Sequence, residues 1–129
     1  IPRLKTDLVD VLLAIIEGNL NQIKVEWTDD VCVGVVMASG GYPGNYQTGF
    51  PITGLDNLDK EIIVFHAGTK TGSELGEVLT TGGRVLTVAA MGKTVAEARE
   101  KVYSNIPRIH FEGCHYRKDI ALFKESSGK

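Results

Sequence analysis

The chain contains little cysteine, almost no excess of charge and no long apolar run. Its 129 residues include two cysteines, and 14 basic residues against 16 acidic ones give a net charge of -2. Two cysteines far apart argue against a disulfide framework, so we predict that Cys32 and Cys114 are thiols. The near-neutral charge provides no basic surface for nucleic acid or for an anionic membrane, and neither is expected as a partner.

No apolar stretch approaches the roughly 20 residues that are needed to span a bilayer. The first residues also lack the basic region, apolar core and cleavage site of a signal peptide. We therefore expect a cytoplasmic protein. A length of 129 residues is typical of one domain. We place that domain at residues 1–124 and predict a disordered polar tail at residues 125–129.

Two segments have the pattern of amphipathic helices. The first follows Thr6, a good N-cap, and ends at Gly18. The second begins with a capping box, Thr94 to Glu97, and should end near Asn105, because Pro107 disfavours helical geometry at the residue before it. The apolar residues that recur at helical spacing are Leu8, Leu12, Ile15 and Ile16 in the first segment and Val95, Ala98, Val102 and Ile106 in the second.

Four further segments have the pattern of strands. Residues 31–38 are almost continuously apolar and rich in valine, which favours a strand buried on both faces, and residues 62–65 are similar. Residues 77–80 form a short candidate strand, and residues 84–91 form a longer one that could continue it as a meander. Helix, strands and helix in this order predict the α+β class, with an antiparallel sheet flanked by helices.

A glycine-rich loop follows the first apolar strand. Four glycines lie between residues 40 and 49, together with Tyr42 and Tyr46. Glycine allows another backbone or a ligand to approach closely, and long loops in compact domains are usually functional. The structural alternative is an irregular turn that is packed by its own aromatic rings.

Arg84 is the first candidate for binding a ligand. It follows Gly82 and Gly83, whose backbone N–H groups can be presented to an anion, and its guanidinium can grip a phosphate with two parallel hydrogen bonds. The structural alternative is an arginine at a strand end that pairs with a carboxylate. His66 and Lys70 are weaker candidates, because a histidine at a strand end is often only structural.

His110, Cys114 and His115 contain zinc-ligating atom types, but no second pair of Cys or His residues completes a familiar zinc spacing. We therefore predict no metal site. The sequence also shows no Ser/His/Asp arrangement, no phosphate-loop lysine motif and no dinucleotide-binding glycine fingerprint. Catalytic residues cannot be assigned from the sequence.

Five motifs, taken in order, resemble the C-terminal domain of glycinamide ribonucleotide synthetase, also called phosphoribosylamine-glycine ligase. They are SGGYPG at 39–44, PITG at 51–54, VFHAGTK at 64–70, TGGRVL at 81–86, and IHFEG at 109–113 followed by YRKDI at 116–120. Residues 1–9 resemble that family's passage out of its ATP-grasp domain. The resemblance implies a single-hybrid-motif-like domain that closes an ATP-grasp ligase.

The family joins glycine to phosphoribosylamine in de novo purine biosynthesis, with hydrolysis of ATP to ADP and phosphate. The resemblance implies that ATP and magnesium bind mainly to upstream domains absent here, that this fragment holds no cofactor, and that it is inactive alone. It implies that phosphoribosylamine and glycine are the substrates. The residues that it implies for substrate binding are Arg84, Gly82, Gly83, His66, Lys70, Gly40 and Gly41. It assigns residues 110–119 to a structural hairpin or to a seam against another domain.

Two alternatives stay open at this point. The chain could be a freestanding module that binds a phosphosugar, which would bind its ligand in isolation. It could instead be a module whose loops serve only to dock other domains. A carboxylase-type relative is disfavoured by the glycine-rich loop together with the Gly82-Gly83-Arg84 motif.

Overall fold

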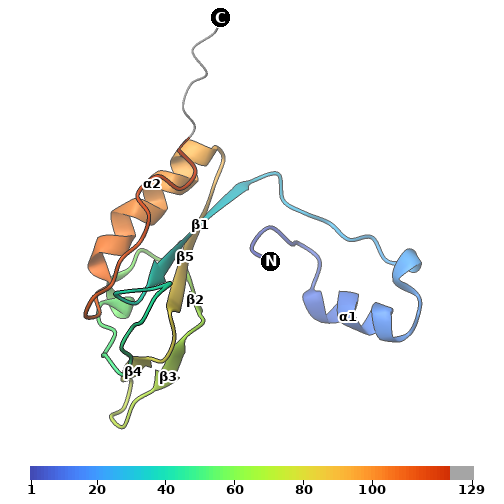
Figure 1. The fold of residues 1–129 in the computed structure, drawn as a ribbon. Coiled ribbons are helices and arrows are strands. Elements are labelled where there is room, and N and C mark those ends of the chain that lie inside the picture. Colours follow the sequence, from blue (N-terminus) through green and yellow to red (C-terminus); the bar gives the residue numbers. More distant parts are fainter. Residues whose placement is uncertain (123–129) are drawn as a thin grey trace, which may run out of the picture.

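Residues 1–122 of the chain are described by a computed structural model (Figure 1). They form a three-stranded sheet with one helix packed on it, a two-stranded ribbon and a second helix that lies apart. The predicted tail at residues 125–129 lies outside the described residues. The elements are α1 Leu8–Ile16, β1 Val31–Ala38, β2 Ile63–His66, β3 Thr69–Thr71, β4 Val78–Thr80, β5 Arg84–Gly92 and α2 Val95–Asn105, with short 3-10 turns at Leu20–Gln22, Leu55–Asn57 and Ile106–Arg108.

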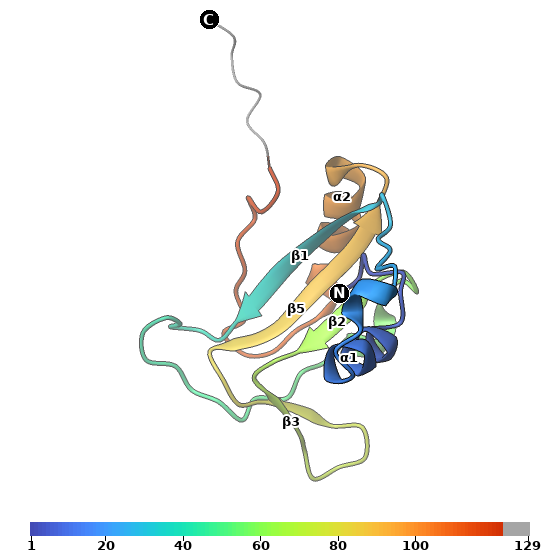
Figure 2. The ribbon, with the colours of Figure 1, turned by 90° about the vertical axis from the view of Figure 1, so that its right-hand side faces the viewer.

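The main sheet has the strand order β1-β5-β2, and all its pairs are antiparallel (Figure 2). β3 and β4 pair with each other in a separate ribbon. The predicted α+β class is therefore confirmed. The predicted meander from residues 77–80 into residues 84–91 is wrong, because the chain turns at Gly82 and Gly83 and β5 then runs between β1 and β2.

The core lies between α2 and one face of the sheet. In β1, Val33, Val35 and Met37 point into this core and are at most 4% exposed, whereas Gly34 and Val36 between them are exposed. The prediction that β1 is buried on both faces is therefore wrong, since only one of its faces is covered within residues 1–122. β2 is also not buried on both faces, because its Phe65 is exposed.

The second helix has the predicted ends. The backbone N–H of Glu97 donates to Thr94 Oγ1 over 3.1 Å, and the helix ends at Asn105. The carboxylate of Glu97 accepts the backbone N–H of Lys93 over 2.8 Å, so the reciprocal half of the capping box is shifted by one residue. The capping box and the effect of Pro107 are thus confirmed as helix signals.

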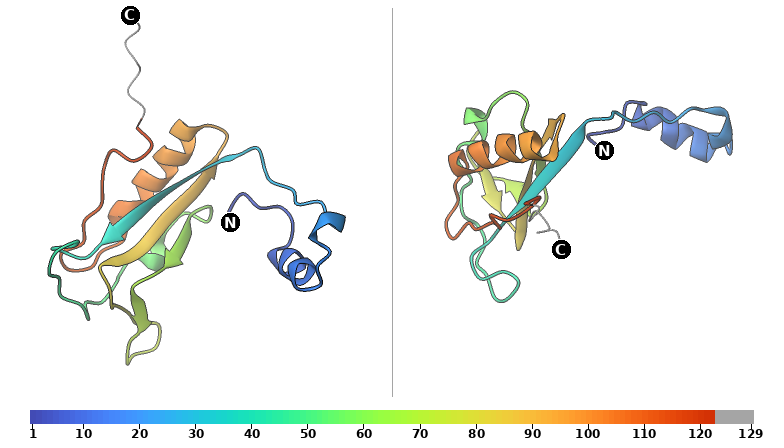
Figure 3. Two further views of the ribbon diagram at one scale, coloured as in Figure 1. Left: turned by 45° about the vertical axis from the view of Figure 1, so that its right-hand side comes forward. Right: turned by 90° about the horizontal axis from the view of Figure 1, so that it is seen from above.

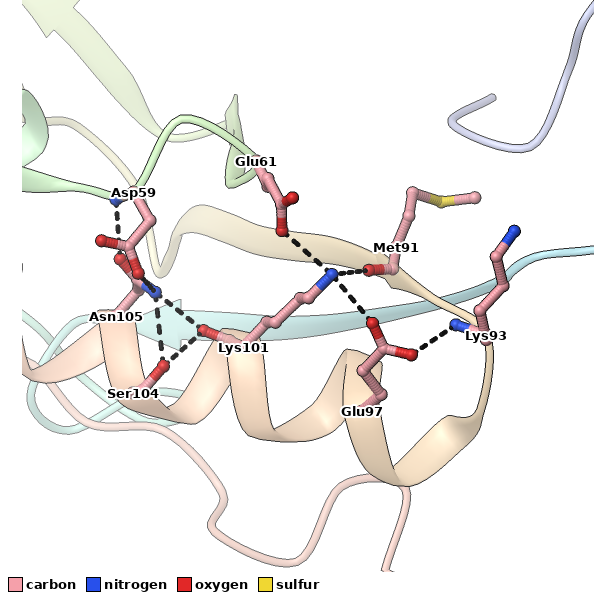
Figure 4. Close-up of polar contacts among 8 residues, drawn as sticks. All are labelled: Asp59, Glu61, Met91, Lys93, Glu97, Lys101, Ser104 and Asn105. Atoms are coloured by element: carbon pink, nitrogen blue, oxygen red, sulfur yellow. Dashed lines mark hydrogen bonds and ion pairs between the residues drawn. The ribbon is translucent and has the colours of Figure 1, made fainter.

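A polar network ties α2 to the neighbouring elements (Figure 4). The ammonium of Lys101 lies 2.9 Å from a carboxylate oxygen of Glu61 and 3.1 Å from one of Glu97, and these two partners raise its pKa. Asn105, which is 1% exposed, accepts the backbone N–H of Asp59 over 2.9 Å and donates to its carboxylate over 3.0 Å. Hydrogen bonds from Asn105 and then from Arg108 lower the pKa of Asp59. The network fixes the segment before β2 against α2.

The first helix belongs to an arm that closes on itself and projects from the sheet (Figure 3). Its N-cap is Asp7, whose carboxylate accepts the backbone N–H of Val9, and not Thr6 as predicted. The hydroxyl of Thr6 instead accepts the backbone N–H of Glu26 over 2.7 Å, which holds the two ends of the arm together. The arm is residues 1–28. The helix itself is present as predicted.

Most apolar side chains of α1 face solvent. Leu12 is 50% exposed, Val9 60% and Ile16 80%, and only Ala14 of the helix is buried. The main packing partner of α1 within residues 1–122 is the neighbouring turn Leu20–Gln22. An amphipathic helix gains most of its stability from packing its apolar face, and within residues 1–122 most of this face is left uncovered.

Candidate functional site

Two of the predicted glycine motifs pack directly on each other at one end of the sheet. A Cβ atom added to Gly68 would lie 2.8 Å from the Cα of Gly82 and 2.7 Å from the carbonyl oxygen of Arg84. The backbone N–H of Gly68 donates to that same oxygen over 2.9 Å. No side chain fits between these backbones, which explains glycine at both positions.

The glycine-rich loop after β1 is fastened to the same place. Ser39, which is 2% exposed, donates from its hydroxyl to the carbonyl of Gly82 and from its backbone N–H to that of Gly83, both over 2.8 Å. Gly83 lies against Tyr42 and Tyr46, because an added Cβ atom would come within 2.2 Å and 3.0 Å of their rings. The loop, the residues around Gly68 and the Gly82-Gly83-Arg84 motif therefore form one cluster.

Glycine is present at positions 40 and 41 for two different structural reasons. Gly41 has a φ angle of +95°, and an added Cβ atom would lie 2.1 Å from the carbonyl oxygen of Asn45. Gly40 faces Gly113, whose carbonyl oxygen would lie 3.0 Å from a Cβ atom at Gly40. The loop can thus adopt this shape only with glycine at position 41, and it approaches the 110–119 segment closely at position 40.

The side chain of Arg84 is exposed and borders a hollow of about 390 Å³ along β1. Gly34 and Val36 form one wall of this hollow, and His115 and Tyr116 form another. Within residues 1–122 the guanidinium has no carboxylate at ion-pair distance, so the pairing alternative finds no partner in this part of the chain. A guanidinium in this state is available to an anionic ligand.

His66 and Lys70, the other two predicted ligand-binding side chains, flank the Gly68 segment of the cluster, but their side chains do not point toward Arg84. Nδ1 of His66 lies 3.1 Å from Oγ1 of Thr69, and Lys70 is exposed in β3, opposite Leu79. Neither side chain lines the hollow beside Arg84. Their predicted role in substrate binding therefore rests on their closeness to Gly82 and Arg84 along the backbone.

A second hollow, of about 380 Å³, lies on the other side of the loop. Its wall includes the ring of Tyr46, the side chains of Asn45 and Gln47, and Glu112 beside Gly113. The sequence interpretation assigned Glu112 only to a structural hairpin or a domain seam. The signal that could have found it is its place between a buried phenylalanine and a glycine, which is typical of a tight turn that presents a side chain.

The candidate metal ligands do not meet. Both backbone polar groups of His115 pair with Ala38, over 2.8 and 3.0 Å, so this segment extends the sheet edge by one bridge. Among residues 1–122 no three His, Cys, Asp or Glu side chains are grouped for a metal ion. Cys32 and Cys114 are free thiols, as predicted, and both are half-buried. In the same part of the chain, no helix is long and apolar enough to cross a membrane.

The chain forms a small α+β domain whose main sheet is open on one face. Its glycine-rich segments pack together at one end of that sheet. A family model described as "Phosphoribosylglycinamide synthetase, C domain" matches residues 32–123, which is well over half of the chain. The chain belongs to this family. The resemblance seen in the five motifs is thereby confirmed.

Relatives and a solved structure agree with the family model. The chain is 48% identical over 121 residues to a phosphoribosylamine–glycine ligase of Caldanaerobacter subterraneus and 50% identical over 119 residues to one of Escherichia coli O157:H7. These matches cover 94% and 92% of this chain but 28% of each relative, so the chain spans little more than a quarter of their length. The crystal structure of the Thermotoga maritima phosphoribosylamine–glycine ligase matches with a TM-score of 0.66 and 36% identity, covering 84% of this chain and 27% of that one.

Proposed function

We propose that this chain is the C-terminal, substrate-positioning domain of a ligase that joins glycine to phosphoribosylamine. The reaction uses ATP, which becomes ADP and phosphate, and it gives glycinamide ribonucleotide in de novo purine biosynthesis in the cytoplasm. The observation that carries the proposal is the match of residues 32–123 to the C domain of phosphoribosylglycinamide synthetase. Relatives that carry the ligase name over more than nine-tenths of this chain support it.

In this proposal the chain supplies the anchor for the substrate phosphate. Arg84 grips the phosphate, and the backbones of Gly82 and Gly83 line its approach, while Gly40 and Gly41 form a wall of backbone beside it. His66 and Lys70 lie close by along the chain and supply a hydrogen-bond donor and a cation. The exposed guanidinium of Arg84, without a carboxylate partner within residues 1–122, supports this assignment.

The chemistry itself is assigned to the larger part of the ligase. The glycine carboxylate takes the terminal phosphate of ATP, and the amine of phosphoribosylamine then attacks the acyl carbonyl, releasing phosphate and a proton. We place ATP and magnesium on upstream ATP-grasp domains. Holding one reactant in place is a large part of catalysis in such a step.

The exposed helix α1 supplies the contact with those domains. Its side chains Val9, Leu12 and Ile16 are half or more exposed, and the family model begins only at residue 32, beyond the arm. An apolar helix face of this kind fits a protein interface. We therefore place the arm at residues 1–28 against the upstream part of the same ligase.

The test is Arg84→Ala in the full-length ligase that contains this chain. The loss of one charged contact to phosphate costs roughly 1.5 to 3 kcal/mol, so KM for phosphoribosylamine should rise by about 10- to 150-fold. KM for ATP and for glycine should stay within about twofold. Lys60→Ala, an exposed lysine away from the cluster, is the matched control and should change none of them.

Two outcomes would contradict the proposal. Equal rises in KM for all three substrates would show that Arg84 has no specific role with phosphoribosylamine. The docking alternative predicts a different result, in which Arg84→Ala weakens assembly of the domain on the rest of the enzyme without changing the KM of the assembled enzyme.

A further inference from the structure

We propose that Ser39 is a positioning residue for Arg84, because it holds the backbone from which the guanidinium projects toward the substrate phosphate. This inference rests on the proposed function, since it takes Arg84 to be the phosphate anchor. It adds a residue of the glycine-rich loop that sets the affinity for phosphoribosylamine without touching it.

A β-bulge in β5 decides which way Arg84 points. Met37 of β1 is paired with Leu86, but the next residue, Ala38, is paired with Arg84, so Val85 is an extra residue on β5. Side chains alternate between the two faces of a regular strand, so Arg84 would otherwise face the core as Leu86 does. Instead Val85 and Leu86 are both 0% exposed and Arg84 is exposed. The bulge thus turns Arg84 to the open face of the sheet, where it borders the hollow along β1 together with Ala38.

The backbone before the bulge has no fixed shape of its own. Gly82 and Gly83 directly precede Arg84, and two glycines in succession allow many backbone conformations. On the other side, the carbonyl oxygen of Arg84 accepts the backbone N–H of Gly68 over 2.9 Å. Arg84 is therefore held from the side that follows it, and its direction still depends on what fixes the two glycines before it.

Ser39 fixes both of these glycines. Its hydroxyl donates to the carbonyl of Gly82 and its backbone N–H donates to the carbonyl of Gly83, both over 2.8 Å. Ser39 is 2% exposed, so these bonds are shielded from competing water. It joins the two segments beyond the bulge and holds both peptide groups that lead into Arg84. Only the bond to Gly82 depends on the side chain, so a substitution removes one contact and keeps the other.

The side chain of Arg84 has no support that could replace this one. It is exposed, and within the described residues its guanidinium forms no ion pair that would fix its direction. A group that is held in place before binding loses less freedom on binding, and a small displacement of a positioning group weakens its contact strongly. The alternative is that Ser39 only fastens the loop. That alternative predicts a loss of stability that does not depend on Arg84.

The experiment is a double-mutant cycle of Ser39→Ala and Arg84→Ala in the full-length ligase. Ser39→Ala alone should raise KM for phosphoribosylamine by about fivefold, the effect of one typical hydrogen bond, and leave KM for ATP and glycine within about 1.5-fold. In the Arg84→Ala background the same change should raise it by less than about 1.5-fold, because no guanidinium is left to position. Ser39→Cys keeps a similar volume with a weaker donor; it should raise KM in the same direction and takes the place of Ser39→Ala if that variant does not fold.

Asn105→Ala is the control for a merely structural effect. Asn105 is also a buried polar residue, 1% exposed, but it lies on α2 and bonds to Asp59. Its loss should lower the Tm of the ligase and leave KM for phosphoribosylamine within about 1.5-fold.

Two results would overturn the role of Ser39 and leave the proposed function standing. One is a Ser39→Ala enzyme with an unchanged KM for phosphoribosylamine, and the other is a rise of about fivefold in both backgrounds. If Arg84→Ala itself leaves this KM unchanged, the proposed function fails and this inference fails with it.

Discussion

Replacing Gly68 with alanine should destabilise the domain and disturb the candidate site at the same time. The added Cβ atom would meet three backbone atoms, the carbonyl oxygen of Arg84 at 2.7 Å and the Cα and N atoms of Gly82, both at 2.8 Å. None of these backbone atoms can rotate away, so the two chain segments must separate. Overpacking of this kind costs about 1–3 kcal/mol. Alanine also restricts the unfolded chain, which returns about 0.4–1 kcal/mol, so the net loss should lie between about zero and 2.6 kcal/mol, with a mid-range value of about 1.3 kcal/mol.

Gly34→Ala is the matched control. Its added Cβ atom would lie 3.3 Å from Cγ2 of Thr87, the end of a side chain that can yield. Neither glycine has a positive φ, so the variants differ mainly in what the new methyl group meets. The assay is urea unfolding of the 129-residue chain, followed by circular dichroism. Gly34→Ala gains the same return of about 0.4–1 kcal/mol from the unfolded chain and has only the Thr87 side chain to move, so the free energy of unfolding should stay unchanged or rise by up to about 1 kcal/mol.

A thermal scan gives a second reading of the same variants. At this chain length 1 kcal/mol corresponds to roughly 3–5 °C in Tm, so Gly68→Ala should melt several degrees below the control. Equal unfolding midpoints for the two variants would refute the conclusion that Gly68 and Gly82 are in backbone contact. It would also remove the structural link between the segment of His66 and the segment of Arg84.

Three further predictions concern the rest of the domain. Asn105→Ala should lower the free energy of unfolding by about 1–3 kcal/mol, because it leaves a polar group of the buried contact with Asp59 unpaired; Ser104→Ala, at an exposed hydroxyl, should cost less than about 0.5 kcal/mol in the same urea experiment. The pKa of Asp59 is held below its ordinary value of 3.8, so the ionised carboxylate stabilises the fold fully above pH 3.8, and this stabilisation is lost as the pH falls through the lowered pKa. Asp59→Asn should therefore make the urea midpoint fall less steeply between pH 5 and pH 2. An unchanged slope would contradict this. Leu12→Gln on α1 should leave the unfolding midpoint of this chain within about 0.5 kcal/mol but lower the Tm of the full-length ligase, and equal effects on both would show that α1 packs within this chain.

The ends of α2 could be predicted from the sequence because the signals are local. The bond from the Glu97 N–H to Thr94 spans three residues, and the effect of Pro107 acts on its neighbour. The cap of α1 was misplaced by one residue for an equally physical reason. Thr6 and Asp7 are both good caps. The choice between them depends on Glu26, whose backbone N–H, twenty residues along the chain, donates to the hydroxyl of Thr6.

The exposure of the strands could not be predicted in the same way. A run of valines has the same pattern whether one or two faces of a strand are covered. For β1 the answer depends on α2 lying on one side and no helix packing closely on the other within residues 1–122, and neither fact is encoded in the strand itself.

The sequence predicted the motifs of the candidate site but not how they lie relative to one another in space. Arg84, Gly82 and Gly83 were identified from neighbouring residues, and the structure adds that Gly68 and the loop after β1 meet them. That meeting depends on β5 running between β1 and β2, which no local pattern shows. Glu112 was overlooked for the same reason, since its partners in the hollow lie more than sixty residues earlier in the chain.

The central position of β5 also bears on the order in which the domain can be made. During synthesis β1 and β2 leave the ribosome first, but in the main sheet as residues 1–122 form it the strand that each pairs with is β5. At about 5–20 residues per second, β1 must wait several seconds for its partner, with its backbone polar groups and valines unpaired. Nascent chains in this interval are exposed to edge-to-edge association, so slowing translation before residue 92 should raise aggregation more than slowing it afterwards.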